Sequence, residues 1–273
     1  MSLSRTQSAK ALQSVRPPRP RLWPAALLLA ALALAMEHLG FFEAGRLGKG
    51  VPNILVFLSE FFPPRFHRPL TLGGTLLETV EMSFVGTSLG ALAALPVSVL
   101  AARNLSRGPA VPPVRALLSV VRSIPALVWG VLFVAAVGLG PTAGTLALAV
   151  YTFGYLGKLF YEILEGVDPE VVEAVRGAGA SGVQVIRHAA LPEAANEMLS
   201  QMLFMFEYNV RASAVLGFVG AGGVGFFMMQ YLQTFQYGRL AGVILVTVAA
   251  VLLIDGLSAR IRSAFLLDRR GRG

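Results

Sequence analysis

The sequence predicts an all-α integral membrane protein with about six transmembrane helices. Of its 273 residues, 55% are hydrophobic and only 14% are charged, whereas charged residues make up about 25% of a typical soluble domain. Long apolar stretches recur along the chain, and several approach the roughly 20 residues that a helix needs to cross a bilayer. Arginines gather between these stretches and at both ends, which marks the cytosolic side of a membrane protein.

The chain begins with a basic arm, residues 1–21, which contains five Lys or Arg residues, three prolines and no acidic residue. We expect this arm to be cytosolic and to form no domain. Residues 22–42 predict the first transmembrane helix, although Glu37 and His38 interrupt it and must be buried against other helices. A cleaved signal peptide is the alternative. We favour a retained helix because the apolar stretch resumes after the interruption.

Residues 43–76 are mixed in charge and contain four prolines. We expect them to form an external loop. Its aromatic-rich part, residues 57–66, predicts a helix that lies on the membrane surface and is anchored by its rings.

The remaining bundle, residues 77–261, predicts five further membrane helices, and a basic cytosolic tail, 262–273, follows it. Pro125 lies near the start of one helix, where proline is best tolerated. The distribution of arginines places both termini, the basic loop 103–122 and the polar loop 165–192 in the cytosol. The five predicted helices span 77–102, 124–139, 142–160, 198–219 and 240–261.

The polar loop, residues 165–192, predicts two short helices joined by a glycine bend. Asp168, followed by a proline, can cap the first helix. Ser181 and Gln184 have the spacing of a capping box for the second helix, which we expect Pro192 to close. Helices of this length are marginal in water by themselves. We therefore expect the polar loop to dock on a partner.

The polar loop resembles the EAA loop of the permease subunits of ABC importers. Val175 and Ala189 replace an alanine and an isoleucine of the family's pattern, but the spacing is kept. The resemblance implies that the loop couples the permease to an ATPase subunit. A DNA-binding helix-turn-helix is disfavoured because the loop has too few basic residues for a phosphate footprint, so no nucleic-acid partner is expected. The residues that carry the resemblance, and that we expect to couple to the ATPase, are Glu173, Ala174, Gly179, Leu191 and Pro192.

Further fragments make residues 77–261 similar to the phosphonate-type ABC permease family. Ala126 stands where an acidic residue is expected. The fragments are RSIPALVW at 122–129, GLGP at 138–141, GKLF at 157–160, and the stretch 209–225.

This resemblance implies the transmembrane domain of a type I ABC importer in the bacterial cytoplasmic membrane. It implies a homodimer with a second permease copy, two ATPase subunits, and an external binding protein that delivers phosphonate or a related small phosphorus oxyanion. The permease itself is expected to carry out no catalysis and to hold no cofactor. Phosphite, phosphate and a different small anion remain open as substrates.

The predicted helix 198–219 carries charges at membrane depth, which are expensive enough to need a reason. Arg211 can pair with Glu207 one helical turn away, or it can attract the transported anion together with backbone amides of the glycine run that follows. That run, GAGGVG, formally matches a dinucleotide fingerprint, but no strand precedes it, so we expect a break in the membrane helix. The candidate translocation residues are Glu207, Asn209, Arg211, Gly220, Gly222, Gly223 and Gly225.

Other function classes are disfavoured by what the sequence contains. The chain has no cysteine, and its three histidines, His38, His67 and His188, share no metal-ligand spacing. A secondary transporter is expected to show an internal repeat, and none is evident. A membrane-embedded enzyme needs a nucleophile and a base, or a metal, which no pattern here supplies.

Overall fold

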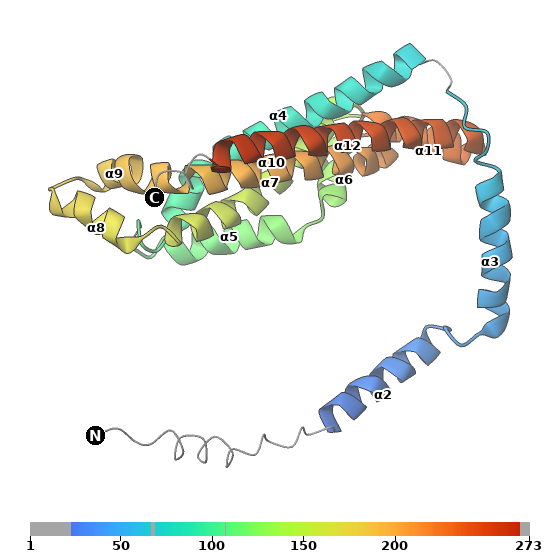
Figure 1. Cartoon of the computed structure of the whole chain (residues 1–273), viewed down its shortest axis with the longest axis horizontal. Helices are drawn as coiled ribbons and strands as arrows, with labels where there is room; N and C mark the ends of the chain where they lie inside the picture. Colours follow the sequence, from blue (N-terminus) through green and yellow to red (C-terminus); the bar gives the residue numbers. More distant parts are fainter. Residues whose placement is uncertain (1–22, 67–68, 107, 268–273) are drawn as a thin grey trace, which may run out of the picture. The chain divides into compact units, whose positions relative to one another are not determined.

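The computed structural model describes residues 23–66, 69–106 and 108–267 (Figure 1). The predicted basic arm 1–21 and residues 268–273 of the predicted tail lie outside the described residues. The chain divides into two units, residues 1–59 and 60–273.

The described part of the first unit consists of two helices of 16 residues each, α2 (Trp23–His38) and α3 (Ala44–Ser59). Helix α2 is apolar up to Met36 and ends with Glu37 and His38, which are exposed rather than buried against other helices as expected. The helix predicted over residues 57–66 is not found there. Helix α3 lies earlier and ends at Ser59, so most of the aromatic-rich stretch follows it. Pro63 and Pro64 follow, and since neither has a backbone N–H, they disfavour a helix there.

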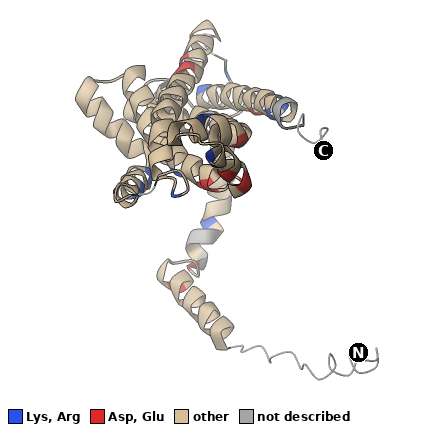
Figure 2. Ribbon diagram, turned by 90° about the vertical axis from the view of Figure 1, so that its left-hand side faces the viewer, with Lys and Arg blue, Asp and Glu red and all other residues tan. Residues whose placement is uncertain are grey.

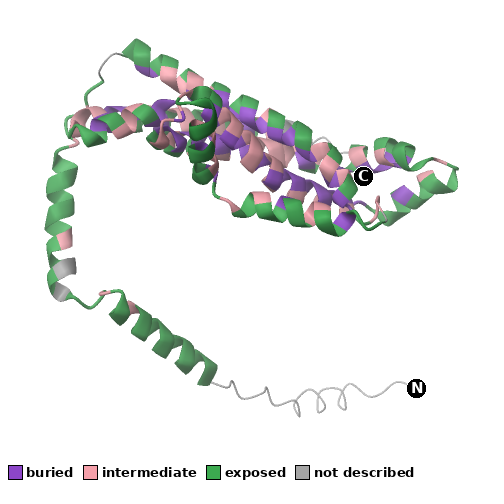
Figure 3. Ribbon diagram, turned by 180° about the vertical axis from the view of Figure 1, so that it is seen from behind, coloured by how far each residue is buried: buried purple, intermediate pink, exposed green. Residues whose placement is uncertain are grey.

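The second unit is a helical bundle in which α4 (Pro69–Ala101) packs along α7 (Pro141–Glu165). Two glycines of α4 permit this close packing. A Cβ atom added to Gly90 would lie 2.7 Å from the carbonyl oxygen of Ala149, and one added to Gly86 would lie 2.8 Å from Cβ of Leu148. Purple, buried turns therefore line the inside of the bundle in Figure 3.

The predicted helix 124–139 is in fact the second arm of a bent pair, α5 (Val111–Ser123) and α6 (Ala126–Val137). The two helices meet at 86°. Pro125 causes the bend because it forces the preceding residue out of the helical region, and Ile124 is accordingly extended, with φ −86° and ψ 120°. Much of the predicted basic loop is therefore helical.

The polar loop contains α8 (Pro169–Gly177) and α9 (Gly182–Val185), as predicted. Pro192, however, does not close the second helix. Instead, α9 continues through a π-helical turn, Ile186–Ala190, into α10 (Leu191–Leu216). The N–H of Leu191 donates to the carbonyl of Ile186, five residues back, and this wider turn accommodates a proline in the first turn of α10.

After α10 the helix does break at the glycine run. A short 3₁₀ turn (Gly217–Val219) leads to Gly220, Gly222 and Gly223, which all have positive φ. Helix α11 (Val224–Gln233), which the sequence did not suggest, and the long α12 (Tyr237–Leu267) complete the bundle.

The described residues form helices, turns and irregular chain, with no strand. By length and composition, three described helices are able to cross a membrane, or four if the bent pair α5–α6 counts as one span. The all-α membrane fold is thus confirmed, while the number of six crossings stays a prediction.

Candidate functional site

The hairpin formed by α8 and α9 has well-defined ends. Asp168 caps α8, since its Oδ1 accepts from the N–H of Glu170 at 2.9 Å. Gly179 makes the bend with φ +82°, and its N–H donates to the carbonyl of Arg176 at 2.9 Å. At the start of α9, the N–H of Ser181 donates to Oε1 of Gln184 at 2.8 Å, which forms one half of the predicted capping box.

One face of the hairpin packs against the bundle. Val172 on α8 and Val185 on α9 are buried, and they belong to the same apolar cluster as Leu164 at the end of α7. The opposite face is open, and Val183 on it is 74% exposed. The hairpin therefore has a fixed base and a free surface.

Polar contacts tie this base to three bundle helices. Arg176 on α8 donates to the carbonyl of Asn104 at 3.1 Å, and Nδ2 of Asn104 donates to the carbonyl of Leu164 at 2.7 Å. Glu165, the last residue of α7, accepts from the N–H of Arg103 at 2.8 Å and forms an ion pair with Arg115 of α5. These contacts join the base of the hairpin to the ends of α4, α5 and α7. The sequence did not single out these contacts, which join residues far apart along the chain.

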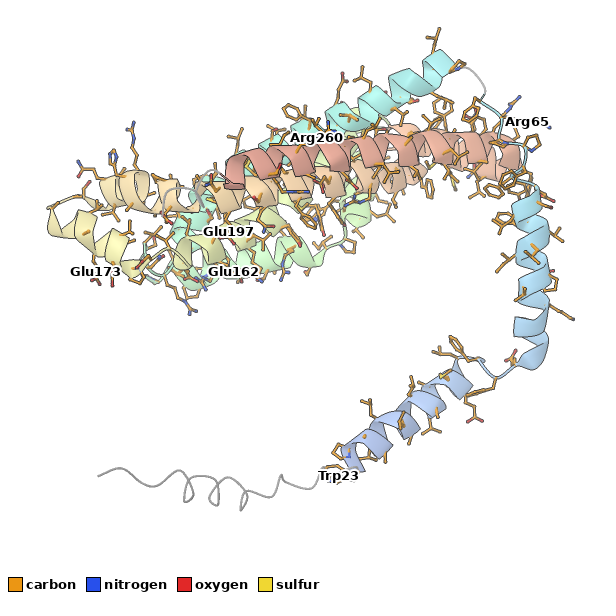
Figure 4. All side chains as sticks on the ribbon, viewed as in Figure 1. Trp23, Arg65, Glu162, Glu173, Glu197 and Arg260 are labelled. Atoms are coloured by element: carbon orange, nitrogen blue, oxygen red, sulfur yellow. The ribbon has the colours of Figure 1, made fainter. Side chains whose placement is uncertain are left out.

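The predicted coupling residues fall into two groups. Glu173, Ala174 and Gly179 are exposed on the hairpin, which Figure 2 views end-on and where Figure 4 labels Glu173. Leu191 and Pro192 lie at its base, in the first turn of α10. The first group is available to a partner, and the second connects it to the bundle.

The charges of α10 do not pair with each other, so the Glu207–Arg211 pair, one of the two alternatives drawn from the sequence, is not formed. Glu207 is only 7% exposed and meets Arg262 of α12 at 2.8 Å, whereas Arg211 meets Asp255 of α12 at 3.3 Å. Helix α12 runs antiparallel to α10, so one partner on it faces each charge. Two ion pairs between α10 and α12 therefore take the place of one pair within α10.

Asn209 lies on another face of α10 and is fully buried. Its Nδ2 donates to Oγ1 of Thr87 on α4 and to Oγ1 of Thr152 on α7, each at 2.8 Å. The side-chain oxygen of Asn209 is buried with no hydrogen-bond partner among the described residues. Asn209 therefore joins three helices within the bundle.

The glycine run is also held by the protein itself. The N–H of Gly223 donates to Oε1 of Glu78 at 2.8 Å, and the N–H of Val224 donates to Oγ1 of Thr79 at 2.9 Å. Both acceptors lie on α4, within a segment predicted to be an ordinary membrane helix. The carboxylate of Glu78 thus occupies the place in which the sequence suggested a passing anion.

Gly220 and Gly225 have structural roles nearby. The carbonyl of Gly220 accepts from the N–H of Gly140 at 2.9 Å, at the start of α7. A Cβ atom added to Gly225 would lie 1.8 Å from the carbonyl oxygen of Ala214. These glycines let the broken helix pack closely against α7 and α10. Among the described residues, no three His, Asp or Glu side chains are grouped as metal ligands.

Comparisons with known proteins agree with this architecture. The model of the family "Binding-protein-dependent transport system inner membrane component" matches residues 94–266. The "Phosphite transport system permease protein PtxC" of Stutzerimonas stutzeri is 40% identical over 246 residues, which cover 90% of each chain. The "Phosphate-import permease protein PhnE" of Mycolicibacterium smegmatis is 37% identical over 218 residues, 80% of this chain and 41% of that protein.

Solved structures show the same fold. A chain of the MetNI methionine ABC transporter, crystallised in inward-facing conformations, superposes with a TM-score of 0.65 at 27% identity, over 73% of this chain and 99% of that one. The resemblance inferred from the sequence motifs is therefore confirmed. The chain belongs to the family of binding-protein-dependent transport system inner membrane components, as a phosphonate-type ABC permease.

Proposed function

We propose that this chain is the membrane-spanning permease of an ATP-driven importer for a small phosphorus oxyanion. The observation that carries the proposal is the 40% identity to a phosphite permease over 90% of both chains. The methionine transporter, at 27% identity, supports the architecture rather than the substrate. Phosphonate, phosphite and phosphate are the candidate substrates, and ATP is hydrolysed by partner subunits.

The proposed assembly contains two permease copies, two ATPase subunits and an external binding protein in the bacterial cytoplasmic membrane. Both termini of the permease and the hairpin face the cytosol. The free surface of the hairpin, with Glu173, Ala174 and Val183, docks on the ATPase. Its base, tied by Arg176 and Glu165 to α4, α5 and α7, passes the movement of the ATPase to the bundle.

The proposed translocation path runs past Arg211 and the glycine run. The side chain of Arg211 is 45% exposed, and its partner Asp255 is 39% exposed. The chain itself thus leaves this ion pair partly uncovered, and an oxyanion can take the place of Asp255 beside Arg211. When the carboxylate of Glu78 releases the N–H of Gly223, the backbone of Gly222 and Gly223 meets the anion. Glu207 and Asn209 hold α10 in position.

Transport by the complete importer tests the proposal. Proteoliposomes that enclose ATP, with the binding protein added outside, are expected to accumulate phosphite, phosphate or methylphosphonate, and to show no uptake without ATP. Methionine and choline serve as controls. ATP-dependent uptake of a control, with none of the phosphorus oxyanions, would refute the assignment of substrate.

A further inference from the structure

Two adjoining hollows lie at the end of the bundle opposite the hairpin. The first, of about 290 Å³, lies between the beginning of α4, helix α11 and the beginning of α12. The second, of about 560 Å³, lies between residues 60–65 and the turn that joins α11 to α12. Gln236 and Arg239 line both hollows. Figure 4 labels Arg65 at this end of the bundle and Glu173 at the other.

The turn between α11 and α12 is fixed by its backbone. Phe235 has φ 54°, in the left-handed region that a bulky residue seldom adopts, and the N–H of Gln236 donates to the carbonyl of Tyr231 at 2.9 Å. The N–H of Arg65 donates to the carbonyl of Gly238 at 2.7 Å. Gly242 makes room for this contact, since a Cβ atom there would lie 2.6 Å from the carbonyl oxygen of Arg65. Arg239 is therefore held at the boundary of the two hollows.

Arg239 differs from three other arginines of the second unit. Arg115, Arg211 and Arg262 each meet a carboxylate. Arg239 is half-buried, and Nη1 donates to Oε1 of Gln236 at 2.5 Å, but across residues 23–66, 69–106 and 108–267 it takes part in no ion pair. A partly buried cation without a counter-charge favours the approach of an anion.

The first hollow supplies the other groups that an oxyanion needs. Arg239 is the one charged residue that lines it among the described residues, and Thr71, Gln230 and Tyr231 line it with hydroxyl and amide groups. In the second hollow Glu60 is balanced by Arg65, so that Arg239 again leaves a net positive charge. A guanidinium group beside neutral hydrogen-bond donors suits the oxygens of a tetrahedral oxyanion.

We propose that Arg239 and the first hollow form an entry site that binds a small phosphorus oxyanion on the outer side of the permease, before it reaches the membrane path. This inference rests on the proposed function for the identity of the ion. A carboxylate of the binding protein could also meet an arginine here. The recessed position of Arg239 between α4, α11 and α12 favours the small ion.

Direct binding to the permease–ATPase complex in detergent, with the binding protein left out, tests the site. The wild-type complex is expected to bind phosphite or ³²P-labelled phosphate in equilibrium dialysis. Arg239→Gln is expected to weaken binding about ten-fold or more, as the loss of a charged hydrogen bond implies, and Arg239→Lys less so. The matched control is Arg260→Gln, which removes an exposed arginine from the other end of α12 and is expected to leave binding unchanged.

Equal binding by the wild type and Arg239→Gln, or no binding by the wild type, overturns the inference. Unchanged oxyanion binding together with weaker docking of the binding protein makes Arg239 a docking contact instead. Thr71→Val keeps every charge and is expected to lower the affinity for the oxyanion several-fold. This second variant tests the site even if Arg239→Gln folds poorly. Uptake by the wild-type importer is measured separately, because its failure refutes the proposed function and leaves the binding result to be judged by itself.

Discussion

Gly179 shapes the hairpin through its backbone conformation alone. Its φ is +82°, and no atom lies within 4 Å of where a Cβ would stand, so a larger side chain has space but a strained backbone. A β-branched residue in this region costs about 1–2 kcal/mol. We expect Gly179→Val to reach the membrane at normal levels while ATP-driven uptake falls about ten-fold or more and ATP hydrolysis continues.

Gly182 is the matched control for this change. It lies in the same hairpin, has equally open surroundings and lacks a positive φ, so Gly182→Val is expected to retain most of the uptake. Full transport by Gly179→Val would show that the bend is not needed for coupling.

The ion pair between Glu207 and Arg262 leads to a prediction about stability. Glu207→Gln or Arg262→Gln alone strands a charge beside α10 and is expected to cost up to about 3–5 kcal/mol, because an unpaired charge is left partly buried. Changing both residues together is expected to restore much of the loss in thermal unfolding of the purified permease.

The comparison pair for this cycle is Glu207→Gln with Arg211→Gln. These two residues meet different carboxylate or guanidinium partners on α12, so their effects are expected to add rather than compensate. If Glu207→Gln with Arg211→Gln restored stability, and Glu207→Gln with Arg262→Gln did not, the ion pairs described above would be contradicted.

At the scale of the helices, the sequence predicted most elements but placed several of their ends wrongly. Periodicity and capping residues identified α7, α8 and α9, because those signals are local. The start of α4 was missed because the mixed charge and the prolines of residues 43–76 suggested a loop. Helix α11 was missed because ten largely apolar residues after a glycine run are too few to suggest a membrane helix. In both cases tertiary packing supplies the stability that local propensity lacks.

The contact between α4 and α7 depends on small residues, which gives a prediction at this scale. Gly90→Ala places a methyl group 2.6 Å from Cβ of Thr152, and is expected to destabilise the permease by about 1–3 kcal/mol through overpacking. Gly73→Ala in the same helix has nothing within 4 Å and is expected to be neutral or stabilising, since alanine favours helices by about 1 kcal/mol over glycine. Equal melting temperatures for the two variants would argue against close α4–α7 packing.

At the scale of the whole molecule, the sequence identified which residues are unusual but not what they contact. Arg211 stood out because charge is rare in membrane helices, and the glycine run stood out because four glycines within six residues favour a break in a helix. Their partners, Asp255 and Glu78, lie on helices far away along the chain. Their positions depend on how helices pack, and a single sequence does not contain that arrangement. The tie between Arg176 and Asn104 was missed for the same reason.

The orientation of the bundle in the membrane gives the last prediction. The hairpin and the turn between α11 and α12 lie at opposite ends of the bundle (Figure 1), and the arginine-rich loop after α4 lies at the hairpin end, where Arg176 meets it. The positive-inside rule then puts that end in the cytosol. The chain has no cysteine, so labelling of a single introduced cysteine shows on which side of the membrane that residue lies. A membrane-impermeant maleimide is expected to label Phe235→Cys in intact cells, and Gly108→Cys or Arg5→Cys only after the membrane is permeabilised. Labelling of Gly108→Cys from outside, with Phe235→Cys protected, would invert the permease and place the Arg239 hollows on the side of the ATPase.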